Sequence, residues 1–258
     1  MFTTRPELAG TFGMVATTHW LASAAGMAAL EKGGNAFDAA VAAGLALQVV
    51  EPHLNGPGGE APILLYSADR DEVLAVAGQG CAPGGLDRAH FERLGLDMIP
   101  PTGLLPACVP GAFGAWMLLL RDFGRLPLGE VICYAIDFAE SGYPMLDRIA
   151  GAIASVEDLF RSEWTGSAEV YLAGDGVPAP GTRWRNTALA RTYHRILSEA
   201  ESAGPEREVQ IEAARRSYYE GFVAEAIDRF ARAETMDSSG TRHAGVLSGH
   251  DLASWRPA

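Results

Sequence analysis

The hydrophobic pattern predicts a chain with more helices than strands. Two stretches rich in Ala and Gly, Leu21–Lys32 and Ala36–Val50, are apolar on nearly every face. Small side chains at helical spacing let two helix backbones approach closely, so we expect these stretches to form a helix pair. Gly33-Gly34 separates the two helices, and Asn35 is expected to cap the second one by accepting hydrogen bonds from its first backbone N–H groups.

Further segments along the chain have the same helical character. The expected helices are Leu86–Leu94, Val109–Phe123 with Pro110 in its first turn, Gly129–Ser141, Leu146–Phe160, Ala188–Ala200, Glu206–Arg216, Glu220–Ala233 and Ser248–Trp255. Glu163–Thr187 is expected to form loops with one helical turn at Ser167–Leu172. Thr235–Gly245 is expected to be a polar linker.

Three short apolar runs are predicted to be strands. Gly13–Thr18 is bounded by glycine, and Ala61–Ser67 and Glu72–Gly78 are joined by the polar turn Ala68–Asp71. The last two runs barely alternate between apolar and polar residues, so we expect a hairpin buried on both faces. The pattern thus favours an α+β fold.

Two loops contain more glycine than a simple connection needs. The first, Glu51–Gly59, follows the second helix, and the other, Gly78–Gly85, follows the hairpin. Loops of this kind bring the backbone close to a ligand or to another strand. The G-x-G of the second loop does not indicate a dinucleotide site, because no helix begins there and Pro83 interrupts it.

Composition narrows the class of protein. A chain of 258 residues can form one large domain or two small ones, and we expect residues 1–258 to form a single domain. The contents of 48% apolar and 20% charged residues are ordinary for a soluble globular protein. The formal charge of −12 argues against nucleic acid or an anionic membrane as a partner. We see no secretory signal and no run near the ~18 apolar residues of a membrane span, so the expected location is cytoplasmic.

The chain offers no convincing catalytic or metal-binding group. Its six His residues are scattered, without the spacing that places two metal ligands on one helix face. Cys81, Cys108 and Cys133 are expected to be buried hydrophobes in a reducing compartment, although Cys81 stands in a loop that could touch a ligand. Asp38, within the second helix, is either a structural carboxylate bonded to backbone or Arg, or an acid/base group.

The sequence resembles the large subunit of the γ-glutamyltranspeptidase family. The resemblance begins at Gly13–Gly59, which includes GMVATTHWLASAAG, GGNAFDAAVA and VVEPHLNGPGG. It continues in family order through the blocks AVAGQGCAP, PACVPGAFGAW, FGRLPLGEVICYAIDFAESGYPM, NTALARTYHRI, YYEGFVAEAI and GVLSGHDLASW. These blocks cover essentially the whole chain.

This resemblance implies a fold and also implies which subunit carries the catalytic residue. Members of the family are N-terminal-nucleophile hydrolases with an αββα sandwich, to which this chain would give mainly helices and a few strands. Their nucleophile is a Thr that becomes N-terminal when the precursor cleaves itself, and it lies on the small subunit. The resemblance therefore implies no catalytic residue here, no metal or cofactor, and a small catalytic subunit from the same precursor as partner. Thr17-Thr18-His19 matches a large-subunit position and not the catalytic triplet.

The residues expected to form one wall of a substrate pocket depart from the family pattern. In members that cleave glutathione, an Arg-Glu pair before an Ala-Pro binds the substrate α-carboxylate, and the matching positions here are Gln79 and Gly80. Asn55, Gly58 and Gly59 match the second wall loop, with Asn55 either forming the loop or donating into the pocket. Glu60, where a third glycine is usual, either faces solvent or contacts the substrate.

Three functions remain open from the sequence. The first is an amidase or acyltransferase like the γ-glutamyltranspeptidases, acting on a small-molecule amide that need not carry a γ-glutamyl group. The second is a related amidase that resembles the cephalosporin acylases. The third is a non-catalytic scaffold that never gains a nucleophile.

Overall fold

Helices make up most of the described chain. The structure, a computed structural model, describes residues 7–172 and 176–258. Its helices are α1 (Trp20–Glu31), α2 (Ala36–Val50), α3 (Arg88–Arg93), α4 (Ala112–Phe123), α5 (Leu128–Ser141), α6 (Asp147–Ser155), α7 (Glu157–Ser162), α8 (Thr165–Tyr171), α9 (Thr187–Ser202), α10 (Arg207–Tyr219), α11 (Phe222–Ala231) and α12 (Gly249–Ser254).

The strands within the described ranges are short and pair two by two. They are β1 (Ile63–Ser67) with β2 (Glu72–Val76), β3 (Tyr143–Pro144) with β4 (Arg183–Trp184), and β5 (Thr235–Met236) with β6 (Arg242–His243). Each pair is antiparallel. The expectation of mainly helices and a few strands is confirmed.

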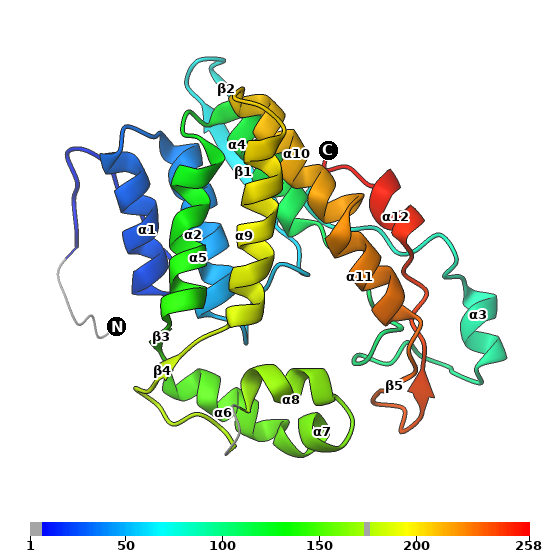
Figure 1. Ribbon diagram of the computed structural model, residues 1–258. Helices are drawn as coiled ribbons and strands as arrows, with labels where there is room; N and C mark the ends of the chain where they lie inside the picture. The colour runs from blue at the N-terminus through cyan, green and yellow to red at the C-terminus, as the bar shows by residue number, and fades with distance from the viewer. Residues whose placement is uncertain (1–6, 173–175) are drawn as a thin grey trace.

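The helices form a packed group with smaller elements at its edges (Figure 1). Contacts run from α1 to α2, from α2 to α5 and α4, from α5 to α9, and from α9 to α10. In Figure 1, α6, α7 and α8 lie below the ends of α5 and α9, while α3 stands apart at the right. Large buried side chains such as Phe113, Tyr193 and Tyr219 belong to one continuous hydrophobic core.

Small residues set the closest helix contacts. A Cβ atom added at Gly26 in α1 would lie 3.0 Å from the Ala39 carbonyl oxygen of α2. One added at Gly44 in α2 would lie 2.5 Å from the ring of Trp116 in α4. Larger side chains at these positions would push the helices apart, so the Ala/Gly pattern does identify a closely packed pair. Asn35 caps α2 as expected, within a capping box that it shares with Asp38.

The β1–β2 hairpin corrects one prediction. Its residues pair as Leu64 with Ala75 and Tyr66 with Val73, so these four side chains share one face. Leu64 is 78% exposed, Val73 65% and Tyr66 56%. Only the opposite face, with Leu65 and Val76, is buried against the core. Within the described chain by itself, the hairpin is therefore buried on one face and not on both as predicted.

Several element boundaries also differ from the sequence prediction. Gly13–Thr18 is not in a strand, because no neighbouring strand pairs with it among the described residues. The expected helix Leu146–Phe160 is divided at Val156, which ends α6 and precedes α7. Helix α4 begins after Gly111, so Pro110 lies just outside it. The expected linker Thr235–Gly245 contains the β5–β6 hairpin.

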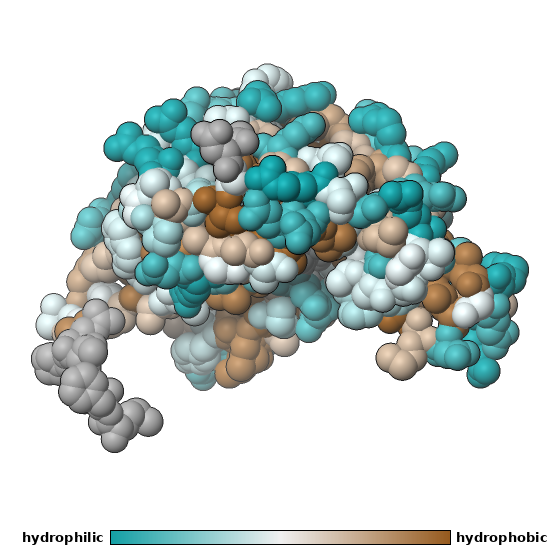
Figure 2. All heavy atoms as spheres, turned by 90° about the horizontal axis from the view of Figure 1, so that it is seen from below, coloured by the Kyte–Doolittle hydropathy of each residue, from teal (hydrophilic) through white to brown (hydrophobic). Residues whose placement is uncertain are grey.

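The α3 segment carries exposed apolar residues. No residue of α3 is buried, and Leu94, Met98 and Ile99 after it are 38%, 80% and 50% exposed. Figure 2, which views the molecule from the side of α6, α7 and α8, shows apolar side chains gathered at the edge where α3 lies. Within the described ranges, none of the helices is long and apolar enough to span a membrane.

Candidate functional site

The two glycine loops meet at the beginning of α4. The Gly59 carbonyl oxygen accepts hydrogen bonds from the backbone N–H groups of Gly111 and Ala112, each at 2.9 Å. In the second loop, the Cys81 carbonyl accepts from the Val109 N–H at 3.0 Å. The segment before α4 thus holds both loops, although they are separated in the sequence by the β1–β2 hairpin.

Close backbone contact explains why two of these positions are glycine. A Cβ atom at Gly80 would lie 1.5 Å from the Val109 carbonyl oxygen, and one at Gly111 would lie 2.1 Å from the Gly78 carbonyl oxygen. Neither distance is possible for a real side chain. A Cβ atom at Gly58 would meet nothing within 4 Å. Packing within the described chain therefore requires Gly80 and Gly111 but leaves Gly58 free to carry a side chain.

The structure brings together four of the five predicted substrate-binding residues. Gly58 and Gly59 in the first loop and Gln79 in the second are exposed, and Gly80 is half-buried. Asn55 is not aimed at the other four, since its side-chain amide donates to the carbonyls of Leu47 and Glu51 at 3.3 and 3.4 Å. This contact favours the loop-forming interpretation of Asn55. Glu60 is exposed, in keeping with a solvent-facing carboxylate.

A buried carboxylate that the sequence analysis did not single out fixes the start of the first loop. Glu51 is fully buried, and its carboxylate accepts hydrogen bonds from the Thr18 hydroxyl and the Arg148 guanidinium. Its carbonyl accepts from the N–H groups of Leu54 and Asn55 at 3.0 and 3.2 Å. Glu51 therefore ties the loop to α6 and to the segment before α1. The signal in the sequence that could have identified Glu51 is its place in the VVEP block that matches the family pattern.

The Thr17-Thr18-His19 triplet has a structural role in this environment. Thr18 binds Glu51, and the His19 Nδ1 atom accepts from the Leu21 N–H at 3.1 Å, which makes His19 the N-cap of α1. His19 is 2% exposed. Burial lowers the pKa of His19, with Glu51 acting to raise it and Arg148 to lower it. Burial likewise lowers the pKa of His53, which belongs to the same cluster.

Asp38 is held as a structural carboxylate. It is fully buried, and its two oxygens accept hydrogen bonds from the backbone N–H groups of Asn35, Arg125 and Leu126 at 2.8 to 3.1 Å. Three N–H donors compensate for the loss of water around the charge. This arrangement favours the structural interpretation over an acid/base role.

The partners and the burial of the other titratable side chains in the described ranges indicate whether they could bind a metal or react. His243, which is half-buried, pairs with the buried Asp237 at 2.7 Å between Nδ1 and Oδ2, and it lies in β6 within the segment that was expected to be a polar linker. Within the described ranges, no group of three or more His, Cys, Asp or Glu residues is arranged to hold a metal ion. Cys81 and Cys108 are exposed, contrary to the expectation that they are buried, and Cys133 is half-buried.

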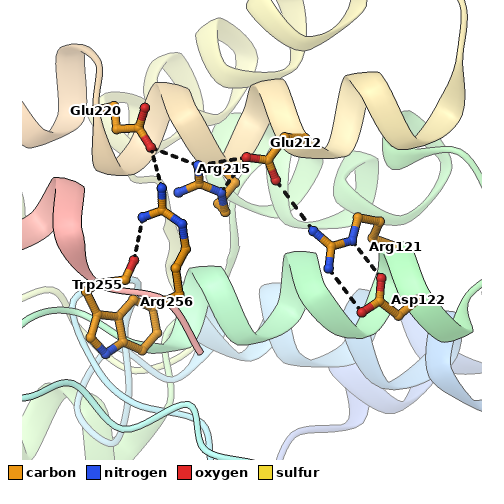
Figure 3. Close-up of polar contacts among 7 residues, drawn as sticks. All are labelled: Arg121, Asp122, Glu212, Arg215, Glu220, Trp255 and Arg256. Atoms are coloured by element: carbon orange, nitrogen blue, oxygen red, sulfur yellow. Dashed lines mark hydrogen bonds and ion pairs between the residues drawn. The ribbon is translucent and has the colours of Figure 1, made fainter. Parts of the chain in front are cut away.

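A network of ion pairs attaches the last described residues to α4 and α10 (Figure 3). Arg215, whose side chain is 8% exposed, lies between Glu212 and Glu220, with distances of 2.7 and 2.8 Å. Arg256, which follows α12, also binds Glu220 at 2.9 Å. These contacts hold the end of the chain near the candidate site, where the Ala258 carbonyl accepts from the Ala77 N–H at 2.6 Å.

Solved structures with this arrangement define the class of protein. The chain superposes on a structure described as LmbA2991T421A with a TM-score of 0.97 and 56% identity, covering 100% of this chain and 44% of that one. It matches the cephalosporin acylase from Bacillus halodurans with a TM-score of 0.78 and 28% identity, covering 100% and 46%. The fold is that of the transpeptidase and acylase structures.

The chain belongs to the γ-glutamyltranspeptidase family, whose model, "Gamma-glutamyltranspeptidase", matches residues 22–258. It is 34% identical over 220 residues to the glutathione hydrolase-like YwrD proenzyme of Bacillus subtilis, covering 84% of this chain and 38% of that protein. It is 37% identical over 196 residues to the oxamate amidohydrolase proenzyme of Klebsiella pneumoniae, covering 73% and 36%. The chain corresponds to the large-subunit portion and spans well under half the length of these relatives.

Proposed function

We propose that the complete protein is an amidase or acyltransferase with an N-terminal Thr nucleophile, and that this chain forms one wall of its substrate pocket. Gln79, Gly80, Gly58 and Gly59 line that wall, and Asn55 supports it. Family membership and the proenzyme names of the relatives support this proposal. The nucleophile belongs to the small subunit, where the freed α-amine can act as the base for its own hydroxyl.

An open apolar surface supports the presence of such a partner subunit. Leu64, Tyr66 and Val73 lie on the exposed face of the β1–β2 hairpin. Gly13–Thr18 is in no helix or strand, and exposed and half-buried residues alternate along it. Exposed apolar sheet faces of this kind are usually covered in the assembled protein.

The single observation that carries the substrate proposal is the geometry at Gln79 and Gly80. Where glutathione-cleaving members have an Arg-Glu pair, this chain has a neutral amide followed by a residue whose Cβ would lie 1.5 Å from the Val109 carbonyl. A guanidinium binds a carboxylate through two charge-assisted hydrogen bonds, whereas Gln79 can donate one neutral bond. We therefore infer that the substrate is an amide without a γ-glutamyl α-carboxylate. The names oxamate amidohydrolase and cephalosporin acylase among similar proteins support this inference.

The first experiment tests the catalytic assignment. The protein is expressed from its full reading frame and analysed by intact mass and N-terminal sequencing. We expect a second polypeptide that begins with Thr. An uncleaved protein without amide turnover would contradict the proposal and favour a non-catalytic scaffold.

A second experiment tests the substrate class. We expect the processed protein to cleave γ-glutamyl-p-nitroanilide with a much higher KM than a non-glutamyl amide. The variant Gln79→Arg restores one guanidinium at an exposed position. The expected gain in binding free energy for the γ-glutamyl substrate is about 2–4 kcal/mol, which corresponds to a KM lowered by about 30-fold to 1,000-fold. The control is Gln210→Arg on α10, where the Gln210 amide donates to the Gly204 carbonyl, and it should leave KM unchanged. A low KM for the γ-glutamyl substrate in the unmodified protein would refute the non-glutamyl assignment.

A further inference from the structure

A large cavity lies between α8, the beginning of α9 and α11. Its volume is about 830 Å³, within the range of roughly 300–1,000 Å³ that is usual for small-molecule sites. Most of its wall is apolar, with Leu189, Val223 and Ile227 on the helices. Pro57 and Gly58, from the first glycine loop, complete the wall. The cavity therefore borders the candidate substrate wall, and Gly58 belongs to both.

Three of the aromatic residues that line the cavity have their polar atoms engaged within the protein. The Trp164 Nε1–H donates to the Met236 carbonyl at 2.9 Å. The Tyr218 hydroxyl donates to the Pro57 carbonyl at 2.6 Å, and the Tyr193 hydroxyl to the Gln48 side chain at 2.8 Å. The aromatic rings are thus left to make apolar contacts. The Tyr218 bond also connects the cavity wall directly to the first glycine loop.

The charges at the cavity disfavour an anionic ligand. None of the described residues that line it is Lys, Arg or His. The Glu163 carboxylate accepts hydrogen bonds from Nε and Nη2 of Arg242, at 2.7 to 2.9 Å, and Glu234 is exposed at the rim. A carboxylate or sulfonate in the cavity would meet no positive partner and would be repelled by Glu234.

We propose that this cavity binds an uncharged aromatic or branched aliphatic group carried by the amide substrate. The identification of that group as part of a substrate rests on the proposed function. The binding of uncharged apolar molecules rests only on the apolar lining and the charges of the cavity. The apolar walls bury the group, while the shared position of Gly58 keeps it next to the wall formed by Gln79 and Gly80.

The binding test uses the complete protein and two probes that differ by one charged group. N-phenyl-1-naphthylamine is neutral, and 1-anilinonaphthalene-8-sulfonate is the same molecule with a sulfonate. Ala188 is exposed and lines the cavity at the beginning of α9, so Ala188→Trp fills the space without entering the core. Ala203→Trp, at the exposed C-cap of the same helix, is the matched control.

We expect the neutral probe to bind with a rise in fluorescence and the sulfonate to bind about tenfold or more weakly. Ala188→Trp should weaken binding of the neutral probe by about tenfold or more, and Ala203→Trp should leave it unchanged. Equal binding by the two variants, equal affinity for the two probes, or no binding of the neutral probe would each overturn the proposal.

An activity measurement separates this proposal from the function on which its substrate assignment rests. Ala188→Trp should lower kcat/KM for phenylacetyl-p-nitroanilide relative to acetyl-p-nitroanilide, and Ala203→Trp should not. Turnover of both amides with no difference between the variants would overturn the cavity as a substrate site while leaving the amidase standing. Binding of the neutral probe at the cavity without turnover of any amide would instead refute the proposed function.

Discussion

Asp38 provides a quantitative test of how the N-terminal helix pair is held to the rest of the fold. Its carboxylate is the common acceptor for three backbone N–H groups, one from Asn35 before α2 and two, from Arg125 and Leu126, in the turn between α4 and α5. The change Asp38→Ala removes all of these bonds, which leaves the Leu126 N–H group buried and the Asn35 and Arg125 N–H groups partly buried. The change Asp38→Asn keeps the shape but replaces one oxygen by an NH₂ group that faces a backbone donor.

The magnitude follows from the number of donors left without a partner. A buried donor that loses its acceptor costs about 1–3 kcal/mol, and water entering the space left by Ala recovers part of this cost. For three donors we expect Asp38→Ala to lower the free energy of unfolding by about 3–5 kcal/mol. Asp38→Asn loses one of the two oxygen positions and should cost about 2–3 kcal/mol.

Urea unfolding of the complete protein, followed by circular dichroism, measures these changes, and amide turnover per folded molecule is measured in parallel. Asp137→Asn is the control, because Asp137 is exposed on α5 and its carboxylate accepts a hydrogen bond from the Ser141 hydroxyl one turn further along the same helix. It should change stability by less than about 0.5 kcal/mol. If both Asp38 variants were as stable as the control, the structural account would be refuted. Normal stability with loss of turnover in Asp38→Asn would instead favour the acid/base interpretation.

Three other changes have expected outcomes. Gly80→Ala should lower the free energy of unfolding by more than about 2 kcal/mol, because the new Cβ atom would collide with the Val109 carbonyl. Gly58→Ala should change it by less than about 0.5 kcal/mol, because a Cβ atom there meets nothing. Equal urea midpoints for the two variants would contradict the described packing of the loops. Burial lowers the pKa of His19 below 6.5, so the unfolded chain binds a proton first as the pH drops, and the free energy of unfolding falls below about pH 6.5. His19→Asn keeps a capping oxygen, and its urea midpoint should fall less between pH 7.5 and 5.5 than that of the unmodified protein. An equal fall in both proteins would rule out this linkage. Arg215→Met should lower the free energy of unfolding by about 1–2 kcal/mol in the same assay. The loss is limited because Glu212 and Glu220 are about a third exposed and can bind water when Arg215 is absent. A gain in stability would show that the ion pairs are not stabilising.

Local signals in the sequence were sufficient for most of the helices. Asn35, before an Ala-rich run, is the predicted N-cap of α2, and Ser248 begins the predicted helix that became α12; each forms a capping box with an Asp three residues later. Capping depends on residues that are neighbours in sequence, and so does the apolar spacing that predicts a helix face. The division between α6 and α7 at Val156 was missed because the apolar spacing continues across it.

The burial of individual residues could not be predicted in the same way. The hairpin sequence has apolar residues on both faces, yet only one face lies against the core. Glu51 reads as an ordinary acidic residue before Pro52, and its partners Thr18 and Arg148 are 33 and 97 residues away in the sequence. No local pattern records such contacts, because they form only when distant segments are brought together.

The sequence by itself determined the family and the helix pair, because each of these depends on residue identity in short stretches of the chain. The tertiary structure decided that the two glycine loops meet before α4, that Gly80 has no room for a side chain, and that a cavity opens beside Gly58. These features depend on distances between segments far apart in the chain, and such distances are fixed by packing and by backbone hydrogen bonds.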